Sequence, residues 1–231
     1  NGDNGRIPII AVTGTNGKTT TVRLTAHLLK ANHLRVGMTN TDGVYVNGRQ
    51  IDDGDCSGPR SARNVLMHPD VDAAVFETAR GGLLREGLAF DRCQVAVVTN
   101  MGAGDHLGLN YITTLEDLSV LKRVIVLNVA PDGMAVLNAA DPQVAMMANM
   151  CPGNVTFFAL DPHHPVLAAH DQAPFAQHIK GQPIARRRDV TDMARQLPMV
   201  QENIVLFHLE QFGAVIGPSG QATAVPFVGD G

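Results

Sequence analysis

The opening forty residues place a short, continuously apolar run before a longer segment with helical periodicity. Residues 7–13 are apolar and rich in β-branched side chains, which is typical of a strand buried on both faces. Residues 18–30 carry apolar side chains at helical spacing, and a glycine-containing stretch, 14–17, joins the two segments. Strand, glycine loop and helix in this order predict the opening unit of a parallel sheet.

Similar patterns recur along the chain. Asn47 and Gly48 lie between two short β segments and predict a hairpin over residues 44–51, which we interpret as an excursion from the main sheet. Further strands are predicted at 35–40, 71–77, 95–99, 134–137 and 155–158, with helices near 60–67, 115–127 and 142–150. The final apolar segments, 204–209, 214–216 and 223–228, predict an antiparallel finish.

Together these elements predict an α/β fold, namely a three-layer, P-loop-type domain with a mostly parallel sheet and an antiparallel finish. Residues 1–160 carry the regular alternation of strands and helices. Residues 161–231 are expected to continue the same domain, first with an irregular segment that is rich in histidine and proline, and then with the terminal strands.

Composition removes several classes of protein. Of the 231 residues, 45% are hydrophobic and 17% are charged, so the chain can bury a substantial core. Eighteen basic against 22 acidic residues give a net charge of −4, which argues against a nucleic-acid partner. No apolar run reaches the length of a membrane span, and the first residues lack a signal-peptide pattern. The widely spaced Cys56, Cys93 and Cys151 indicate reduced thiols, so we expect a globular cytoplasmic protein.

The segment GTNGKT, residues 14–19, carries the clearest chemical signal. Glycines let a backbone approach a polyphosphate closely, and the following helix offers unpaired N–H groups and its positive dipole end. Lys18 would bridge β- and γ-phosphate oxygens, and the Thr19 hydroxyl would ligate Mg²⁺. The general phosphate-loop pattern places glycine where this chain has Val12, so the alternative is an ordinary tight turn between strand and helix.

Five motifs, in this order, resemble the Mur ligase superfamily of ATP-dependent carboxylate–amine ligases. They are VTGTNGKTT at residues 12–20, GPRSAR at 58–63, ETARGG at 77–82, DHLG at 105–108 and VLNAADP at 136–142. Within the superfamily they are most similar to the Mur-ligase-like central module of cyanophycin synthetases. The resemblance covers about residues 7–160 and implies that this region is an ATP-binding central domain.

The resemblance implies that ATP phosphorylates a carboxylate and that an incoming amine displaces the phosphate to form an amide. In the cyanophycin branch, the amine is that of arginine and the carboxylates are the side chains of a poly-aspartate backbone. ATP and Mg²⁺ are then the expected cofactors, and the expected partners are an amino acid and an acidic polymer or peptide acceptor. Two alternatives stay open: a ligase of the folylpolyglutamate or peptidoglycan-precursor type, and a non-catalytic ATP-binding module.

The resemblance also implies further parts of the protein. A C-terminal lobe and an ATP-grasp module have no counterpart in these 231 residues, so we expect both in the full-length protein. The isolated chain is accordingly expected to be an incomplete enzyme, since closure of a second lobe would normally exclude water from the acyl phosphate. Homo-oligomerisation is left open.

For the nucleotide, the resemblance assigns the loop together with a later motif. Asn138 can pair with the adenine edge through its amide, whereas Asp141, which precedes Pro142, can equally cap a helix. The expected cofactor-binding residues are Gly14, Thr15, Asn16, Gly17, Lys18, Thr19, Thr20, Asn138 and Asp141.

For metal binding and catalysis, the resemblance assigns Thr19, Glu77 and His106 to the metal, and Lys18, His106 and Lys122 to catalysis. Glu77 ends an apolar strand, at the edge where parallel sheets bind ligands. Lys122 matches a lysine that several relatives carbamylate, which converts a cation into an anionic metal ligand. The alternatives are a solvated carboxylate, a structural histidine and a solvated lysine on a helix face.

For the acceptor, we expect Thr41, Asp42, Arg60, Arg63 and Arg80 to flank the binding groove. Arginine binds carboxylates in a bidentate fashion, which suits aspartyl groups. Solvated side chains on a loop and on a helix face are the alternative.

Overall fold

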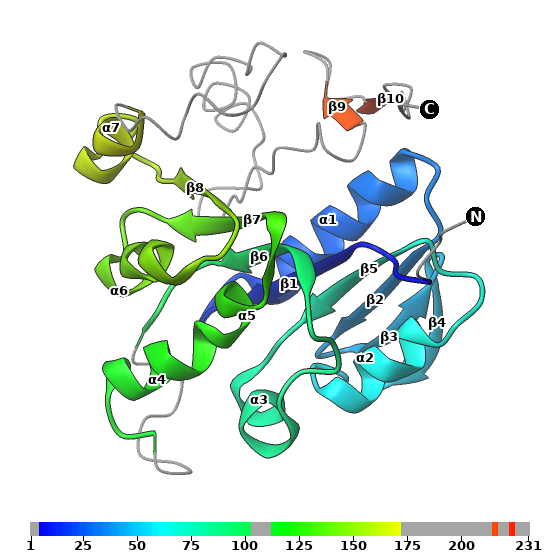
Figure 1. Ribbon diagram of the computed structural model, residues 1–231. Coiled ribbons are helices and arrows are strands. Elements are labelled where there is room, and N and C mark those ends of the chain that lie inside the picture. The colour runs from blue at the N-terminus through cyan, green and yellow to red at the C-terminus, as the bar shows by residue number, and fades with distance from the viewer. Residues whose placement is uncertain (1–4, 103–111, 172–213, 217–221, 225–231) are drawn as a thin grey trace.

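A single eight-stranded sheet organises the molecule. The computed structural model describes residues 5–102, 112–171, 214–216 and 222–224 (Figure 1). The strand order is β4-β3-β2-β5-β1-β6-β7-β8; the strands from β2 to β8 in this order pair in parallel, and β3 and β4 pair antiparallel at one edge. The strands are β1 (Ile9–Thr13), β2 (Val36–Asn40), β3 (Gly43–Val46), β4 (Arg49–Asp53), β5 (Ala73–Glu77), β6 (Cys93–Val98), β7 (Val129–Asn138) and β8 (Asn154–Phe158).

Helices cover both faces of this sheet, which confirms the predicted three layers (Figure 1). Along β1, Ile10 and Val12 belong to the apolar core on the side of α1, whereas Ile9 and Ala11 belong to the core on the side of α2 and α5. Apolar side chains on both faces explain why the strand reads as a continuous apolar run. The helices are α1 (Lys18–Ala31), α2 (Pro59–Leu66), α3 (Arg80–Glu86), α4 (Leu115–Lys122), α5 (Val124–Leu127), α6 (Pro142–Ala145) and α7 (Pro165–Asp171), with a 3₁₀ turn at Met146–Met150.

The strand order places β1 at a switch point. From β1 the chain runs through α1 to β2 on one side, and β6 later joins β1 on the other side. Ligands of open α/β sheets bind beyond the carboxyl ends of the strands at such a point. The glycine stretch 14–17 follows β1 directly and therefore lies at the expected ligand edge.

The interpretation of residues 44–51 as an excursion was wrong. Asn47 and Gly48 do turn a hairpin, but β3 pairs with β2 and so extends the main sheet. Val44 and Val46 are buried, so one face of β3 shares the core, whereas every residue of β4 is exposed. The antiparallel part of the main sheet is thus this early hairpin.

Two helical predictions also need correction, and the helices α3 and α7 were not predicted, α7 lying in the segment that was expected to be irregular. The helix predicted over 115–127 is divided at Arg123 into α4 and α5, and the helix predicted over 142–150 continues as a 3₁₀ turn after α6. The short helix α3 was missed, because Gly81 and Gly82 weaken its helical signal.

The end of the chain contains a small antiparallel pair. β9 (Ala214–Ile216) and β10 (Ala222–Ala224) pair with each other and form a separate two-stranded sheet. The segment 204–209 and residues 225–228 lie outside the described residues. All three cysteines are free thiols. Within the described ranges, no helix has both the length and the apolar character that a membrane span requires.

Candidate nucleotide and metal site

The loop between β1 and α1 adopts a conformation that requires glycine. Gly14 has a φ of 145° and Gly17 a φ of 82°, both in the region that other residues rarely occupy. A Cβ atom added at Gly14 would lie 1.8 Å from the Thr99 hydroxyl oxygen, because the loop packs directly against the end of β6. The two glycines therefore serve both the backbone conformation and the close approach of two chain segments.

Asn100, a candidate site residue whose role the sequence left undetermined, holds the loop. The Thr15 N–H donates to the Asn100 carbonyl at 3.0 Å, and the Asn16 N–H donates to Asn100 Oδ1 at 2.9 Å. The Thr99 hydroxyl donates to the Asn16 carbonyl at 2.6 Å. Two of the loop N–H groups expected to face phosphate are thus used to fix the loop. The available signal was the position of these polar residues directly after a buried strand.

The start of α1 retains the features of an anion site. No side chain caps the helix at Gly17, so its first N–H groups have no side-chain acceptor. The Lys18 ammonium reaches back over the loop and donates to the Thr15 carbonyl at 2.9 Å. Thr20 is exposed in the first turn. The predicted loop residues therefore converge on one edge of the sheet, as expected.

Thr19 and Glu77 form the chemically most specific pair. The Thr19 hydroxyl donates to Glu77 Oε2 at 2.8 Å, and Glu77 is only 1% exposed. The other carboxylate oxygen, Oε1, is buried and has no hydrogen-bond partner. Burial raises the pKa of Glu77, although the Thr19 bond and the charge of Lys18 act in the opposite direction. The alternative of a solvated carboxylate is wrong.

This arrangement fits a divalent cation. A hydroxyl and a carboxylate are hard oxygen ligands, and Mg²⁺ usually combines one or two such groups with water and phosphate oxygens. A cation would also compensate the buried, unpartnered Glu77 oxygen. In the described part of the chain, no group of three or more His, Cys, Asp and Glu side chains could hold a metal by itself. His106, the third predicted ligand, lies outside the described residues.

Lys122 is brought to the loop from 107 residues away. It ends α4, is only 1% exposed, and its ammonium donates to the Thr15 hydroxyl at 3.2 Å. The alternative of a solvated helix-face lysine is therefore wrong. Its predicted role in catalysis, and its carbamylation, stay predictions.

Asn138 and Asp141 connect the ends of β6 and β7. The Asn138 amide donates to the Thr99 carbonyl at 2.9 Å and accepts from the Ala140 N–H. Asp141 caps α6 by accepting from two N–H groups in its first turn, and its second oxygen accepts from the Met101 N–H at 2.6 Å. The capping alternative for Asp141 is confirmed, and the contact of both residues with adenine stays a prediction.

The predicted acceptor residues are more exposed and less closely grouped. The turn after β2 brings the Thr41 hydroxyl to 3.4 Å from that of Thr19, and Asp42 forms an ion pair with Arg23 of α1. On α2, Arg63 lies 3.6 Å from Glu86, and Arg60 is exposed. Arg80 begins α3 and is partly exposed. Their assignment to a substrate stays a prediction.

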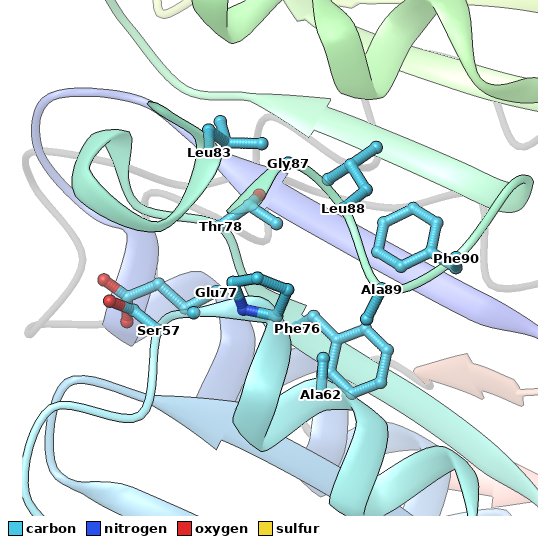
Figure 2. A pocket seen from close by; sticks show the side chains of 12 residues that line it. Ser57, Ala62, Phe76, Glu77, Thr78, Leu83, Gly87, Leu88, Ala89 and Phe90 are labelled. Carbon is cyan, nitrogen blue, oxygen red and sulfur yellow. The ribbon is translucent and has the colours of Figure 1, made fainter. Parts of the chain in front are cut away.

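A small pocket lies beside Glu77, between α2, α3 and β5 (Figure 2). Ser57 and Glu77 lie at its polar end, and the Ser57 hydroxyl donates to Asp55 at 2.6 Å. Phe76 and Phe90 stack with ring centroids 6.0 Å apart and make the rest of the lining mostly apolar.

Fold and site together define the class: a three-layer α/β domain with a phosphate-loop-type turn at the carboxyl edge of a parallel sheet. The family model of the Mur ligase middle domain matches residues 12–191. The chain belongs to this family, which confirms the resemblance based on the motifs.

Similar proteins support the same assignment. The chain is 52% identical over 169 residues to the cyanophycin synthetase of Synechocystis sp., which covers 73% of this chain but only 19% of that protein. It is 32% identical over 150 residues to UDP-N-acetylmuramoyl-L-alanyl-D-glutamate--2,6-diaminopimelate ligase of Chlorobaculum tepidum, covering 62% of this chain and 28% of that one. The chain thus spans about a fifth of the length of the cyanophycin synthetases that it matches.

Solved structures share the fold. A UDP-N-acetylmuramoyl-L-alanyl-D-glutamate--2,6-diaminopimelate ligase superposes with a TM-score of 0.57 at 25% identity, covering 68% of this chain and 33% of that chain. A bifunctional folylpolyglutamate synthase/dihydrofolate synthase, solved with Mn, AMPPNP and L-glutamate bound, gives a TM-score of 0.50 at 21% identity, covering 67% and 44%. The second likeness concerns the fold alone.

Proposed function

We propose that this chain is the nucleotide-binding part of an ATP-dependent amide ligase that acts through an acyl phosphate. The observation that carries the proposal is the Thr19–Glu77 pair beside the glycine loop, with one buried carboxylate oxygen left without a partner. Such a pair would hold Mg²⁺ next to phosphates bound at the start of α1. When bound, the cation would neutralise charge on the phosphates.

The residues of the chain then take separate roles. Lys18 would leave the Thr15 carbonyl and neutralise the β- and γ-phosphates, and the first N–H groups of α1 would bind their oxygens. The Lys122 ammonium donates to the Thr15 hydroxyl of the loop, and without carbamylation its positive charge would act on the same phosphates. His106 is proposed for the same centre because of its motif, DHLG.

The reaction would proceed in two balanced steps. A carboxylate oxygen of the acceptor attacks the γ-phosphorus of ATP, the bond to the β-phosphate oxygen breaks, and ADP leaves. The amine of an amino acid then attacks the carbonyl carbon of the acyl phosphate. Inorganic phosphate leaves, the nitrogen loses a proton, and an amide remains.

For the substrates, we propose arginine as the amine and the side chains of poly-aspartate as the acceptor. The identity of about half of the aligned residues to proteins named cyanophycin synthetase supports this choice. Arg60, Arg63 and Arg80 place positive charge on the adjoining helices α2 and α3. The remaining modules of the enzyme are proposed to lie in a longer protein, because the chain spans so small a part of those relatives.

The test has two arms. Calorimetry of this chain with a non-hydrolysable ATP analogue and Mg²⁺ should show binding, and no binding would overturn the nucleotide assignment. The full-length protein, given ATP and a short poly-aspartate peptide, should release ADP in proportion to added arginine. ADP release only with folate or peptidoglycan-type acceptors would identify another ligase of the family. The absence of any ADP release that depends on an amino acid would support a non-catalytic ATP-binding module.

A further inference from the structure

Asn40, the last residue of β2, shapes the turn beside the proposed metal site. Its side chain is fully buried, and its Oδ1 accepts hydrogen bonds from the N–H groups of Asp42 at 2.8 Å and Gly43 at 3.1 Å. Asparagine stabilises turns in this way because its side chain replaces a backbone acceptor. The conformation of residues 40–43 therefore depends on one carboxamide.

The register of the sheet places this carboxamide next to Glu77. β2 and β5 pair in parallel with Thr39 opposite Phe76, so Asn40 and Glu77 occupy the next position on the two strands. Met38 and Val75, two residues earlier on each strand, both belong to the core on the side of α1. Because side chains alternate along a strand, Asn40 and Glu77 share that face.

The turn reaches Glu77 through Thr19. The Thr19 hydroxyl donates to Glu77 Oε2 at 2.8 Å. The Thr41 hydroxyl lies 3.4 Å from the Thr19 hydroxyl. The turn that Asn40 holds therefore determines where Thr41 lies against the donor to this carboxylate.

Both neighbours carry a buried atom without a partner. Among the described residues, Asn40 Nδ2 and Glu77 Oε1 are two of the four buried side-chain atoms that make no hydrogen bond. One is a donor and the other an acceptor, and each would destabilise the fold by about 1–3 kcal/mol if it stayed unsatisfied. An amide beside Glu77, unlike a second carboxylate, adds no negative charge there.

We propose that Asn40 is a positioning residue of the metal centre, which holds the Glu77 carboxylate in its ligating orientation through the turn 40–43. This inference rests on the proposed function, because it requires Glu77 to bind a cation. Partners of metal ligands typically contribute about 10–100-fold to metal affinity. The same turn carries Thr41 and Asp42, so it also connects the proposed acceptor groove to the metal ligand.

The experiment measures Mn²⁺ affinity of this chain in the presence of a non-hydrolysable ATP analogue, from the electron paramagnetic resonance signal of free Mn²⁺. Asn40→Ala should weaken Mn²⁺ binding by about 10-fold or more. Asn40→Ser, whose hydroxyl can accept in the same turn, should recover part of the affinity. Nucleotide affinity measured without metal should change little in both variants.

Asn128→Ala provides the matched control. Asn128 also holds a local turn, because its Nδ2 donates to the Val124 carbonyl at 2.7 Å, but it precedes β7 at the opposite edge of the sheet. Its loss should lower the melting temperature and leave Mn²⁺ affinity unchanged. A purely structural role of Asn40 would give that same result for Asn40→Ala.

Each outcome separates the two proposals. Parent-like Mn²⁺ affinity of Asn40→Ala, or of Asn40→Leu if the alanine variant does not fold, would overturn the positioning role and leave the proposed function intact, because neither side chain has an acceptor for the turn. A folded serine variant that binds Mn²⁺ as weakly as the alanine variant would show that Asn40 does not act on Glu77 through the turn 40–43. A parent protein that binds the nucleotide analogue but no Mn²⁺ would overturn the metal assignment itself.

Discussion

The carboxyl edge of the sheet contains two regions of different construction. The nucleotide half consists of the loop 14–19, the strand end at Thr99 and Asn100, and Lys122. Its members come from three distant parts of the chain and are joined by hydrogen bonds in a partly buried setting, with Thr99 and Lys122 buried. The acceptor half consists of the turn 41–43 and the helices α2 and α3. Its charged side chains are largely exposed, and they form ion pairs at the surface, Asp42 with Arg23 of α1 and Arg63 with Glu86.

The difference indicates which half is rigid before a ligand binds. In the nucleotide half, hydrogen bonds already hold the loop backbone and Lys122, and only Lys18 has to change its partner. Such preorganisation is what electrostatic stabilisation of a transferring phosphoryl group requires. In the acceptor half, exposed ion pairs contribute little to stability and can exchange partners when an acidic chain arrives. Substitutions in the first half should therefore affect folding and binding strongly, and those in the second should affect mainly acceptor binding.

The largest effect is expected for Gly14→Ala. The new methyl group would lie 1.8 Å from the Thr99 hydroxyl, in a backbone conformation unfavourable to alanine. The free energy of unfolding should fall by about 3 kcal/mol or more, and binding of a nucleotide analogue should be lost. Urea unfolding and calorimetry measure the two quantities.

Gly54→Ala, between β4 and α2 on the side of the acceptor half, is the matched control. Gly54 also has a positive φ, of 88°, but a Cβ atom there would have no neighbour within 4 Å. The free energy of unfolding of Gly54→Ala should fall by only about 1 kcal/mol, because only the backbone conformation is unfavourable to alanine. Equal losses for the two variants would show that the nucleotide half is no more tightly built than the acceptor half.

Next in size is the effect of Lys18→Ala on nucleotide affinity. Removing a charge-assisted contact to phosphate is worth about 1.5–3 kcal/mol, so the dissociation constant for the ATP analogue with Mg²⁺ should rise by about 10–100-fold. Stability should change little, because Lys18 makes only a local bond to the Thr15 carbonyl. Lys30→Ala, at the other end of α1, should leave affinity unchanged. An unaltered affinity for the Lys18 variant would reject the loop as the phosphate site.

Parts of the nucleotide half that are adjacent along the chain could be predicted from the sequence, whereas parts joined by distant contacts could not. The loop, the start of α1 and the carboxylate at the end of β5 follow from local patterns, since glycine, lysine, threonine and strand ends have position-dependent chemistry. Asn100 and the burial of Lys122 depend on contacts across more than 80 residues, which no local pattern encodes. The resemblance pointed to Lys122, but only the packing of α4 shows that it is buried.

The fold shows the same division between local and distant information. Six buried parallel strands were predicted from apolar runs. The position of the hairpin in the main sheet was not predicted. The pairing of β3 with β2 depends on the core residues that Val44 and Val46 pack against, and the alternation of apolar and polar residues in β3 does not reveal them. Sequence patterns likewise missed α3, whose glycines favour a loop although its first turn packs closely against Gly58.

A smaller effect, visible as a pH dependence, is expected for Glu77→Gln. Because burial raises the pKa of Glu77, the native state without metal binds a proton more readily than the unfolded state. Binding of this proton stabilises the native state. The stabilisation is fully present below the ordinary pKa of glutamate and is lost as the pH rises through the raised pKa of Glu77. The parent should therefore lose free energy of unfolding relative to Glu77→Gln as the pH rises from about 4, near the ordinary pKa of glutamate, through the raised pKa.

Two comparisons isolate this effect. Glu86→Gln changes an exposed carboxylate of the acceptor half and should show no such relative gain with pH. Adding Mg²⁺ and the nucleotide analogue should reverse the order at neutral pH, because the metal binds only the carboxylate form. A constant difference between Glu77→Gln and parent across the pH range would contradict the assigned direction of the pKa shift.

The smallest effect is expected for Arg60→Ala in the acceptor half. Arg60 is exposed on α2, so the free energy of unfolding should change by less than about 0.5 kcal/mol. Binding of a short poly-aspartate peptide to the full-length protein should weaken by a few-fold, since an exposed ion pair contributes about 0.2–1 kcal/mol. Because such a contact is screened by salt, the loss should shrink as ionic strength rises.

Arg49→Ala controls for net charge. It removes another exposed arginine, at the start of β4, away from the carboxyl edge of the parallel strands. If the two variants weaken peptide binding equally, the acceptor is attracted only by overall charge, and the acceptor half is not a binding groove.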